Sequence, residues 1–294
     1  MSLQALIIVN QRASSYKKHM LKDVLNTFRA NGYMVDVFNT KKKGDAQARS
    51  QEAVKEGYPL IIAAGGDGTI NEIINGIAFT DVCLGVLPFG GENVLGREIG
   101  LNRHLTNAIN TIINGKAHNI TLGRITNSDG KVRYFSMMAG IGFDAAVVYG
   151  VNTRIKRISS RLAHVISGLK AFSNHQPILN IKLNGQSYAG YWLIAANGAK
   201  YGGNLIISPD ANIESDNLNV VIFQKNGKLD TLRYVFGIIT SRHLYFVDVM
   251  SAVCTPNTVI EVEGVSHVQI DGEYFGMTPC KIESVPNAIK IQIK

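Results

Sequence analysis

Residues 65–72 read Gly-Gly-Asp-Gly-Thr-Ile-Asn-Glu and follow an apolar run, a pattern that could bind phosphate groups. A helix N-terminus exposes unpaired N–H groups, and glycine lets the backbone approach an anion closely. Thr69 and Glu72 have the spacing of a capping box, which predicts a helix that begins at Thr69. Asp67 would face the same space and repel phosphates unless a cation intervenes, which indicates Mg²⁺ and a nucleoside triphosphate. The alternative is a turn that needs glycine for its shape alone.

Two better-known nucleotide motifs do not explain the chain. The sequence contains no G-x-x-x-x-G-K-[ST], which excludes a P-loop NTPase. Residues 140–145, GIGFDA, match the dinucleotide pattern, but the acidic residue expected about 20 positions later is missing. That region is basic instead, which disfavours a Rossmann dehydrogenase and leaves these glycines to allow close packing.

Strands and helices alternate in the first part of the chain, and the strands are continuously apolar. This pattern predicts an α/β fold with a doubly wound parallel sheet. Hairpin signals after about residue 119 predict a mainly antiparallel β domain, interrupted by helices near 156–173 and 229–241. We expect a nucleotide-binding α/β domain over 1–122 and a β-rich substrate domain over 123–294, whose last strand is free to return to the first domain. The expected elements of the first domain are strands 4–10, 33–38, 60–64 and 82–87 and helices 16–30, 45–57, 69–79 and 104–115.

Composition narrows the class of protein. The chain has 294 residues, is 46% hydrophobic, and has three cysteines without CxxC spacing. These values argue against disorder, a disulfide framework and a cysteine-based zinc site. No apolar run approaches the roughly 18 residues that span a bilayer, so we expect a soluble, cytoplasmic protein.

The net charge is +8, which suits nucleic acid, anionic lipid, phosphorylated ligands, or solubility alone. No nucleic-acid-binding pattern stands out, so we expect no nucleic acid partner. Basic residues crowd the start of segment 154–172, where they oppose the helix dipole, and an anionic membrane surface would offset that cost. The apolar stripe of this segment fits a protein core better than insertion into a membrane. Residues 41–43, all lysine, could assist phosphate binding or be simply solvated.

The stretch GGDGTINEIINGI (65–77) resembles the hallmark of the diacylglycerol kinase catalytic-domain family, which includes bacterial lipid kinases and sphingosine kinases. Further segments resemble this family in the same order, over most of the chain: 86–100, 134–148, 197–211 and 270–273. The resemblance implies an NAD kinase/diacylglycerol kinase-like fold and a lipid kinase, a phosphotransferase with an alcohol acceptor. It also implies ATP and Mg²⁺, a role in phospholipid biosynthesis, a diacylglycerol-like substrate in an interdomain cleft, and transient membrane association.

The resemblance also assigns roles to single residues. Glu273, in the Asp-Gly-Glu stretch, would be the general base, and Asp67 a second catalytic residue; an ordinary hairpin turn is the alternative for Glu273. Gly91 stands where the family has threonine, and Glu92 adds a negative charge. Both changes should weaken ATP binding unless a metal ion, Lys or Arg compensates. The residues implied to contact ATP are Asn10, Thr40, Gly65, Gly66, Asp67, Gly68, Thr69, Asn71, Gly91 and Asn93.

Other readings stay open. A structural Mg²⁺ site of the family maps onto Glu214, Ser215 and Asp216, but with an altered pattern. The chain could instead be a kinase of a soluble substrate such as NAD, which shares the glycine motif. It could also be a nucleotide- or lipid-binding homologue without turnover, as Gly91, Glu92 and the altered metal loop suggest. A homodimer through an exposed strand of the second domain is a further option.

Overall fold

The computed structural model describes residues 3–101, 104–150 and 177–294. The chain forms two compact units, Met1–Thr121 with Asn287–Lys294, and Leu122–Pro286. The basic segment 154–172 and the helix expected near 156–173 lie outside the described residues. In the described parts of the chain, no helix is long and apolar enough to cross a membrane.

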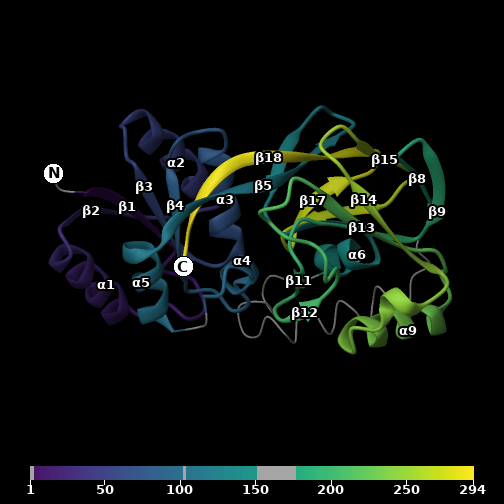
Figure 1. Ribbon diagram of the computed structural model, residues 1–294, viewed down its shortest axis with the longest axis horizontal. Helices are drawn as coiled ribbons and strands as arrows, with labels where there is room; N and C mark the ends of the chain where they lie inside the picture. Colours follow the sequence, from purple (N-terminus) through teal and green to yellow (C-terminus); the bar gives the residue numbers. More distant parts are fainter. Residues whose placement is uncertain (1–2, 102–103, 151–176) are drawn as a thin grey trace. The chain divides into compact units, whose positions relative to one another are not determined.

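Strands and helices alternate along the first unit (Figure 1). In chain order they are β1 (Leu3–Val9), α1 (Lys18–Ala30), β2 (Tyr33–Asn39), α2 (Asp45–Lys55), β3 (Leu60–Gly65), α3 (Asp67–Ile77), β4 (Cys83–Pro88), α4 (Val94–Glu98) and α5 (Leu105–Asn114). Strands β5 (Lys116–Asn127) and β18 (Cys280–Ile293) each contribute to both units. The short helix α4 was not predicted from the sequence.

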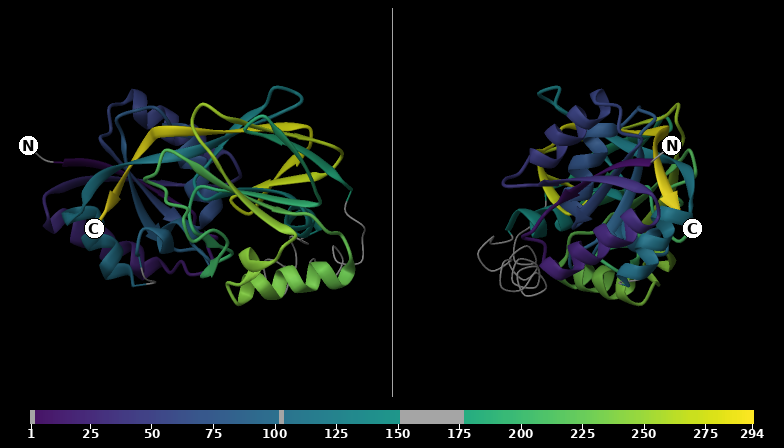
Figure 2. Two further views of the ribbon diagram at one scale, coloured as in Figure 1. Left: turned by 45° about the vertical axis from the view of Figure 1, so that its right-hand side comes forward. Right: turned by 90° about the vertical axis from the view of Figure 1, so that its left-hand side faces the viewer.

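The sheet of the first unit has the order β2-β1-β3-β4-β18, and the neighbouring strands within the unit are parallel. Helices α2 and α3 pack together on one face, and α1 and α5 on the other (Figure 2). Because both faces are covered, β3 is buried throughout, whereas the edge strand β2 is partly exposed. The predicted doubly wound parallel sheet is confirmed.

The second unit is built mainly from antiparallel strands. Its elements are β6 (Val132–Phe135), β7 (Met138–Gly142), α6 (Phe143–Gly150), β8 (Leu179–Leu183), β9 (Gln186–Gly190), β10 (Trp192–Ala196), β11 (Lys200–Tyr201), β12 (Leu205–Ile206), β13 (Leu218–Phe223), α9 (Lys228–Ile239), the 3₁₀ helix η1 (His243–Tyr245), β14 (Val249–Cys254), β15 (Val259–Glu263), β16 (His267–Ile270) and β17 (Glu273–Met277).

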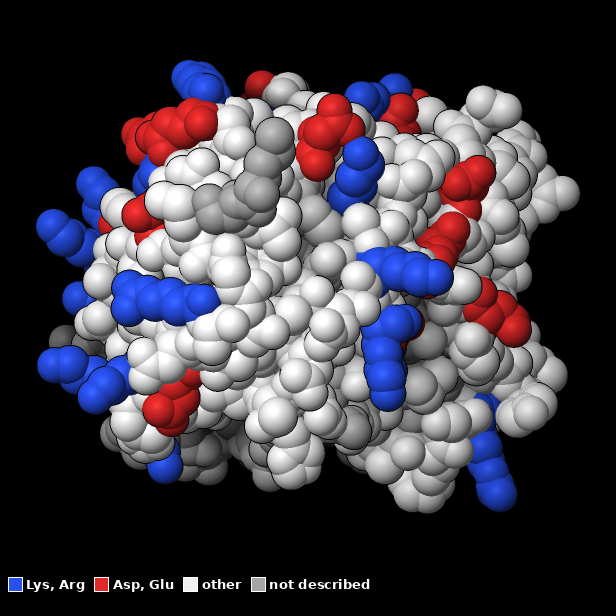
Figure 3. Space-filling view, turned by 60° about the vertical axis from the view of Figure 1, so that its left-hand side comes forward, with Lys and Arg blue, Asp and Glu red and all other residues white. Residues whose placement is uncertain are grey.

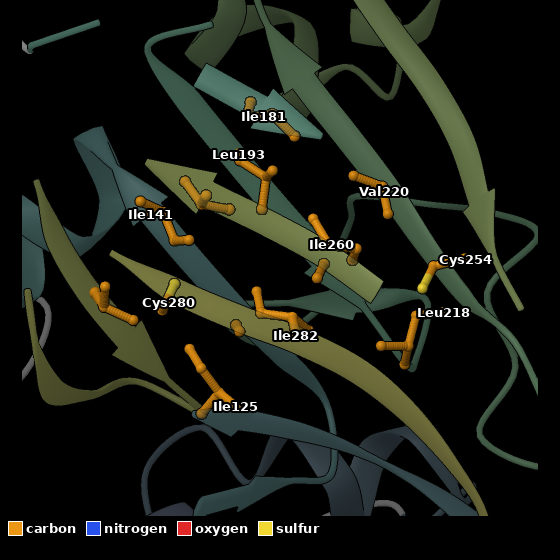
Figure 4. Packing of buried hydrophobic residues seen from close by; sticks show 14 of the residues in the cluster. Ile125, Ile141, Ile181, Leu193, Leu218, Val220, Cys254, Ile260, Cys280 and Ile282 are labelled. Carbon is orange, nitrogen blue, oxygen red and sulfur yellow. The ribbon is translucent and has the colours of Figure 1, made fainter. Parts of the chain in front are cut away.

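One sheet of this unit has the order β14-β13-β10-β7-β16-β17, and β18, β15, β8 and β9 form the opposing layer with β5 and β6. Side chains from both layers meet in a buried core, for example Ile141 and Leu193 against Ile260 and Ile282 (Figure 4). Helix α9 covers the other face of the six-stranded sheet. The antiparallel β domain predicted for the second half of the chain is therefore confirmed.

Charged side chains are unevenly spread over the surface. Figure 3 shows one face, on which Lys and Arg are densest along the left edge while basic and acidic side chains are interspersed elsewhere. On this face, Lys and Arg therefore gather along one edge, and the rest of the face carries side chains of both signs.

Candidate active site

The parallel strands of the first unit end at one edge of its sheet, and the residues that follow them are linked by backbone hydrogen bonds. The N–H of Asn10, after β1, donates to Ala64 of β3 at 2.9 Å. The N–H of Thr40, after β2, donates to Val9 of β1 at 2.9 Å, and its hydroxyl bonds the same carbonyl at 3.3 Å. Ligands of open α/β sheets bind at this edge.

The glycine loop leads from β3 into α3 at this edge. Gly66 is the N-cap of α3 and no side chain caps the helix, which leaves the first turn suited to an anion. A Cβ on Gly65 would lie 2.7 Å from the Thr69 side chain, and one on Gly90 would lie 2.4 Å from Cα of Gly66. The glycines therefore allow the loop after β3 and the loop after β4 to touch.

The Asp67 carboxylate joins these two loops. Its Oδ1 accepts the N–H of Val94 at 2.6 Å, and its Oδ2 accepts the N–H of Asn93 at 3.0 Å. The Asn93 side chain in turn bonds both the N–H and the carbonyl of Gly90, at 3.1 and 2.7 Å. Asp67 and Asn93 thus set the shape of the loop between β4 and α4, which we call the second loop.

The remaining residues expected to bind nucleotide lie in or beside α3. Asn10 donates to the Thr69 hydroxyl at 3.3 Å, which links the end of β1 to the first turn of α3. Gly68 belongs to that same turn. Asn71 is buried and accepts from the Asn75 side chain at 3.2 Å.

The predicted capping box is wrong. Helix α3 begins at Asp67 rather than Thr69, and no side chain caps it. The buried Glu72 carboxylate instead accepts the N–H of Gly44 at 2.9 Å and of Ala46 at 3.2 Å, at the start of α2. The N-cap of α2 is Gly44, which has no side chain of its own to satisfy these groups, so an acceptor from α3 replaces it.

The second loop carries the two departures from the family pattern. Among the described residues, a Cβ on Gly91 would meet only the Ser14 hydroxyl within 4 Å, at 3.5 Å, so the position has room for a larger residue. Arg97 lies 3.8 Å from the Glu92 carboxylate and donates to the Glu92 carbonyl at 2.5 Å. A cation therefore accompanies the added negative charge.

The three lysines after Thr40, residues 41–43, have exposed side chains. The N–H groups of Lys41 and Lys42 donate to the Asp45 carboxylate at 2.8 and 3.0 Å, and these bonds lower the pKa of Asp45. The lysine side chains are thus presented at the end of β2.

In the second unit, Glu273 begins β17 directly after a tight hairpin turn. Asp271 and Gly272 have φ values of +46° and +78°, which fits a type I′ turn. The Asp271 carboxylate accepts the N–H groups of Ser136, Met137 and Met138, at 2.8 to 3.0 Å, and the Ser136 hydroxyl at 3.1 Å. The half-buried Glu273 carboxylate lies 4.0 Å from the Arg133 guanidinium.

A buried pair behind this turn was missed by the sequence analysis. Gln269 donates to the buried Asp144 carboxylate at 2.9 Å and accepts the N–H of Gly272 at 2.8 Å. Burial raises the pKa of Asp144 to about 7. Gln269 stands in β16, two residues before Asp271, but its partner Asp144 is remote in sequence, and no spacing signal links the two.

The glycines of GIGFDA serve packing, as expected. A Cβ on Gly140 would lie 2.0 Å from the Asp144 carboxylate, and one on Gly142 would lie 2.1 Å from the Tyr191 carbonyl. This segment therefore has a structural role in the second unit.

The residues suggested for a structural Mg²⁺ site, Glu214, Ser215 and Asp216, lie in the loop before β13. Glu214 and Ser215 follow a turn held by Asn212, and the Ser215 hydroxyl accepts the N–H of Asn217 at 3.3 Å. The carbonyl of Asp216 accepts the Ser284 hydroxyl at 2.5 Å. Within the described ranges, no group of three or more His, Cys, Asp or Glu side chains could hold a metal ion.

Comparisons with known proteins agree with this architecture. The diacylglycerol kinase catalytic domain matches residues 4–125, and the YegS C-terminal NAD kinase beta sandwich-like domain matches residues 137–293. A diacylglycerol kinase of Bacillus subtilis (strain 168) is 30% identical over 285 residues, covering 94% of this chain and 91% of the relative. One from Staphylococcus haemolyticus (strain JCSC1435) is 28% identical over 283 residues, covering 93% and 83%.

A solved structure from Bacillus anthracis str. Sterne has the same fold, with a TM-score of 0.82 at 24% identity over 99% of this chain and 95% of that chain. The relatives and the two matched domains together span nearly all of the sequence. The chain belongs to the diacylglycerol kinase catalytic-domain family, whose named members are phosphotransferases with an alcohol acceptor.

Proposed function

We propose that this chain is an ATP- and Mg²⁺-dependent kinase that transfers the γ-phosphate to the hydroxyl of a diacylglycerol-like lipid. The observation that carries this proposal is the N-terminus of α3, where Gly66 leaves the first turn without a side-chain cap beside the second loop. Backbone N–H groups at such a terminus suit a triphosphate. Membership of the family supports ATP as the phosphate donor.

In this proposal, residues 1–122 bind the nucleotide and residues 123–294 bind the lipid. Mg²⁺ would supply charge neutralisation at the phosphates, and one or two carboxylates of the chain would hold it there. Asp67 is the proposed carboxylate because it lies in the first turn of α3 and contacts the second loop through both of its oxygens. The lysines of 41–43 add positive charge near the end of β2.

Glu273 is the proposed general base. Its carboxylate takes the proton of the lipid hydroxyl as that oxygen attacks the γ-phosphorus. The bond between the γ-phosphorus and the β–γ bridging oxygen breaks, and ADP leaves with the electron pair. Asp271 and Gln269 hold the turn that carries Glu273, which supports a fixed position for the base.

The test is transfer of labelled γ-phosphate from ATP to a panel of diacylglycerol, other lipid alcohols and NAD. We expect diacylglycerol to be labelled, and the Glu273→Gln variant to lose about 10²- to 10⁴-fold in rate while it still binds ATP. Glu261→Gln is the matched control, because Glu261 lies on β15 and forms an ion pair with Lys281 at 2.6 Å. Labelling of NAD instead of lipid would overturn the proposed substrate. ATP binding without transfer to any acceptor would favour a homologue without turnover.

A further inference from the structure

Helix α9 presents a row of large apolar side chains to solvent. Its inner side, with Tyr234 and Ile238, packs on the six-stranded sheet. Its outer side carries four exposed apolar residues, three, seven and ten positions after the first, which is the spacing of a single helix face. They are Leu229 (82% exposed), Leu232, Phe236 (66%) and Ile239.

The segment that follows α9 adds to this surface. Tyr245 and Val247 are 84% and 98% exposed. We call these six residues, Leu229, Leu232, Phe236, Ile239, Tyr245 and Val247, the α9 face. Single exposed apolar residues are ordinary on a protein surface. A continuous row of them along one helix instead indicates a site of interaction with a protein, a membrane or a ligand. In both views of Figure 2, no other described element lies over the outer side of α9.

The α9 face is held rigidly. The Arg233 guanidinium forms ion pairs with Asp230 and Asp248 and lies 5.2 and 5.1 Å from the ring centroids of Tyr234 and Phe246. The Tyr234 hydroxyl donates to Asp248 at 2.7 Å. These contacts fasten the segment after α9 to the helix, so little order would have to be gained when the face binds a partner.

The border of the α9 face is basic. Residues 228–247 contain Lys228, Arg233 and Arg242 but a single acidic residue, Asp230, which pairs with Arg233. Lys228 and Arg242 are exposed, and neither has an acidic partner in the described parts of the chain. An apolar helix face with a cationic border matches the interface of a membrane that contains anionic lipid.

We propose that the α9 face docks on an anionic lipid bilayer, with α9 lying in the plane of the interface. The proposal rests on the lipid substrate proposed above, because a kinase of a bilayer lipid must work at that surface. Leu232 and Phe236 would enter the boundary between headgroups and acyl chains, where Tyr245 also suits the interface. Lys228 and Arg242 would lie against the anionic headgroups.

The test is co-sedimentation with phosphatidylcholine vesicles with and without phosphatidylglycerol, in the absence of ATP. The double variant Leu232→Ser/Phe236→Ser should bind vesicles about tenfold or more weakly, because it removes apolar area that enters the bilayer. Val265→Ser is the matched control, an exposed apolar residue outside the α9 face. The variant Lys228→Ser/Arg242→Ser should weaken binding only to the vesicles with phosphatidylglycerol.

A second experiment measures how deeply the α9 face enters the bilayer. The chain has one tryptophan, Trp192, which is buried, so Phe236→Trp supplies a distinguishable signal at the α9 face. Its emission should shift to the blue on vesicles and be quenched by brominated acyl chains. Unchanged vesicle binding of the double serine variant would overturn the proposal. If that variant still binds vesicles but no longer self-associates, the α9 face belongs instead to an interface with a second copy of the chain. Neither measurement depends on phosphate transfer, so both can be interpreted even if the kinase assay fails.

Discussion

The Asp67 carboxylate accepts the backbone N–H of Val94 at 2.6 Å, and this bond ties the start of α3 to the start of α4. A second bond, from the N–H of Asn93 at 3.0 Å, completes the link. The two loops proposed to contact ATP are therefore one structural unit. Asp67, which its motif assigns to catalysis, therefore also has a structural role.

Substitution of Asp67 should separate these two tasks. Asp67→Ala removes the acceptor of two backbone N–H groups and should cost about 1–3 kcal/mol in the free energy of unfolding, measured with urea. Asp67→Asn keeps one acceptor oxygen and should restore part of that stability. If Asp67 also holds Mg²⁺, both variants should lose phosphate transfer, whereas full activity in Asp67→Asn would limit Asp67 to its structural task.

Gly91→Thr should strengthen ATP binding. In the described parts of the chain, the added Cβ meets only the Ser14 hydroxyl, at an ordinary contact distance, and the new hydroxyl can donate to a phosphate oxygen. One added hydrogen bond of about 0.5–1.5 kcal/mol predicts a decrease of about two- to tenfold in the Kd for ATP, measured by calorimetry. Gly91→Val, which is similar in size but has no hydroxyl, is the control. An equal gain in both variants would rule out the hydrogen bond as the cause.

Glu72→Ala should destabilise the first unit through α2. The Glu72 carboxylate is buried and accepts the N–H groups of Gly44 and Ala46, so its loss leaves both without this acceptor. We expect a loss of about 1–3 kcal/mol in the free energy of unfolding. Glu52→Ala, at an exposed residue of α2, should change it by less than about 0.5 kcal/mol. Similar effects of the two substitutions would contradict this role of Glu72.

Asp144 should make stability depend on pH. Burial raises its pKa from 3.8 to about 7, so between these values the folded chain holds a proton that the unfolded chain has lost. The free energy of unfolding should therefore fall as pH rises from about 4 to about 7 and stay lower above that.

Asp144→Asn removes this titration and keeps an acceptor for Gln269. Relative to wild type, the variant should gain stability between about pH 5 and about pH 8, by about 1–3 kcal/mol in urea unfolding. Parallel pH profiles of the two proteins would show that Asp144 does not titrate in this range.

Elements with strong periodicity were predictable. The apolar strands β1, β3 and β4 and the amphipathic α1, with its end at Asn31 and Gly32, lie where the sequence placed them. The glycine loop was recognisable because glycine is needed where backbones approach closely, as at Gly66 and Gly90. Apolar periodicity, helix ends and glycine positions depend on neighbouring residues in the sequence, so they could be predicted without knowledge of distant partners.

Features that depend on distant partners were not predictable. Glu72 has the spacing of a local cap, yet its carboxylate binds α2 because the glycine that starts that helix has no side chain. The bonds of Asp67 to the second loop and of Gln269 to Asp144 join segments remote in sequence. Type and spacing along one segment carry no information about such partners.

The central claim is that the N-terminus of α3 binds the triphosphate of ATP. Backbone amide hydrogen exchange with and without ATP and Mg²⁺ tests it directly, because each amide reports separately. We predict slower exchange on ATP binding at residues 66–70 and 90–94, with little change at the control strand β9 of the second unit. Protection confined to other segments, with these two loops unchanged, would contradict the claim.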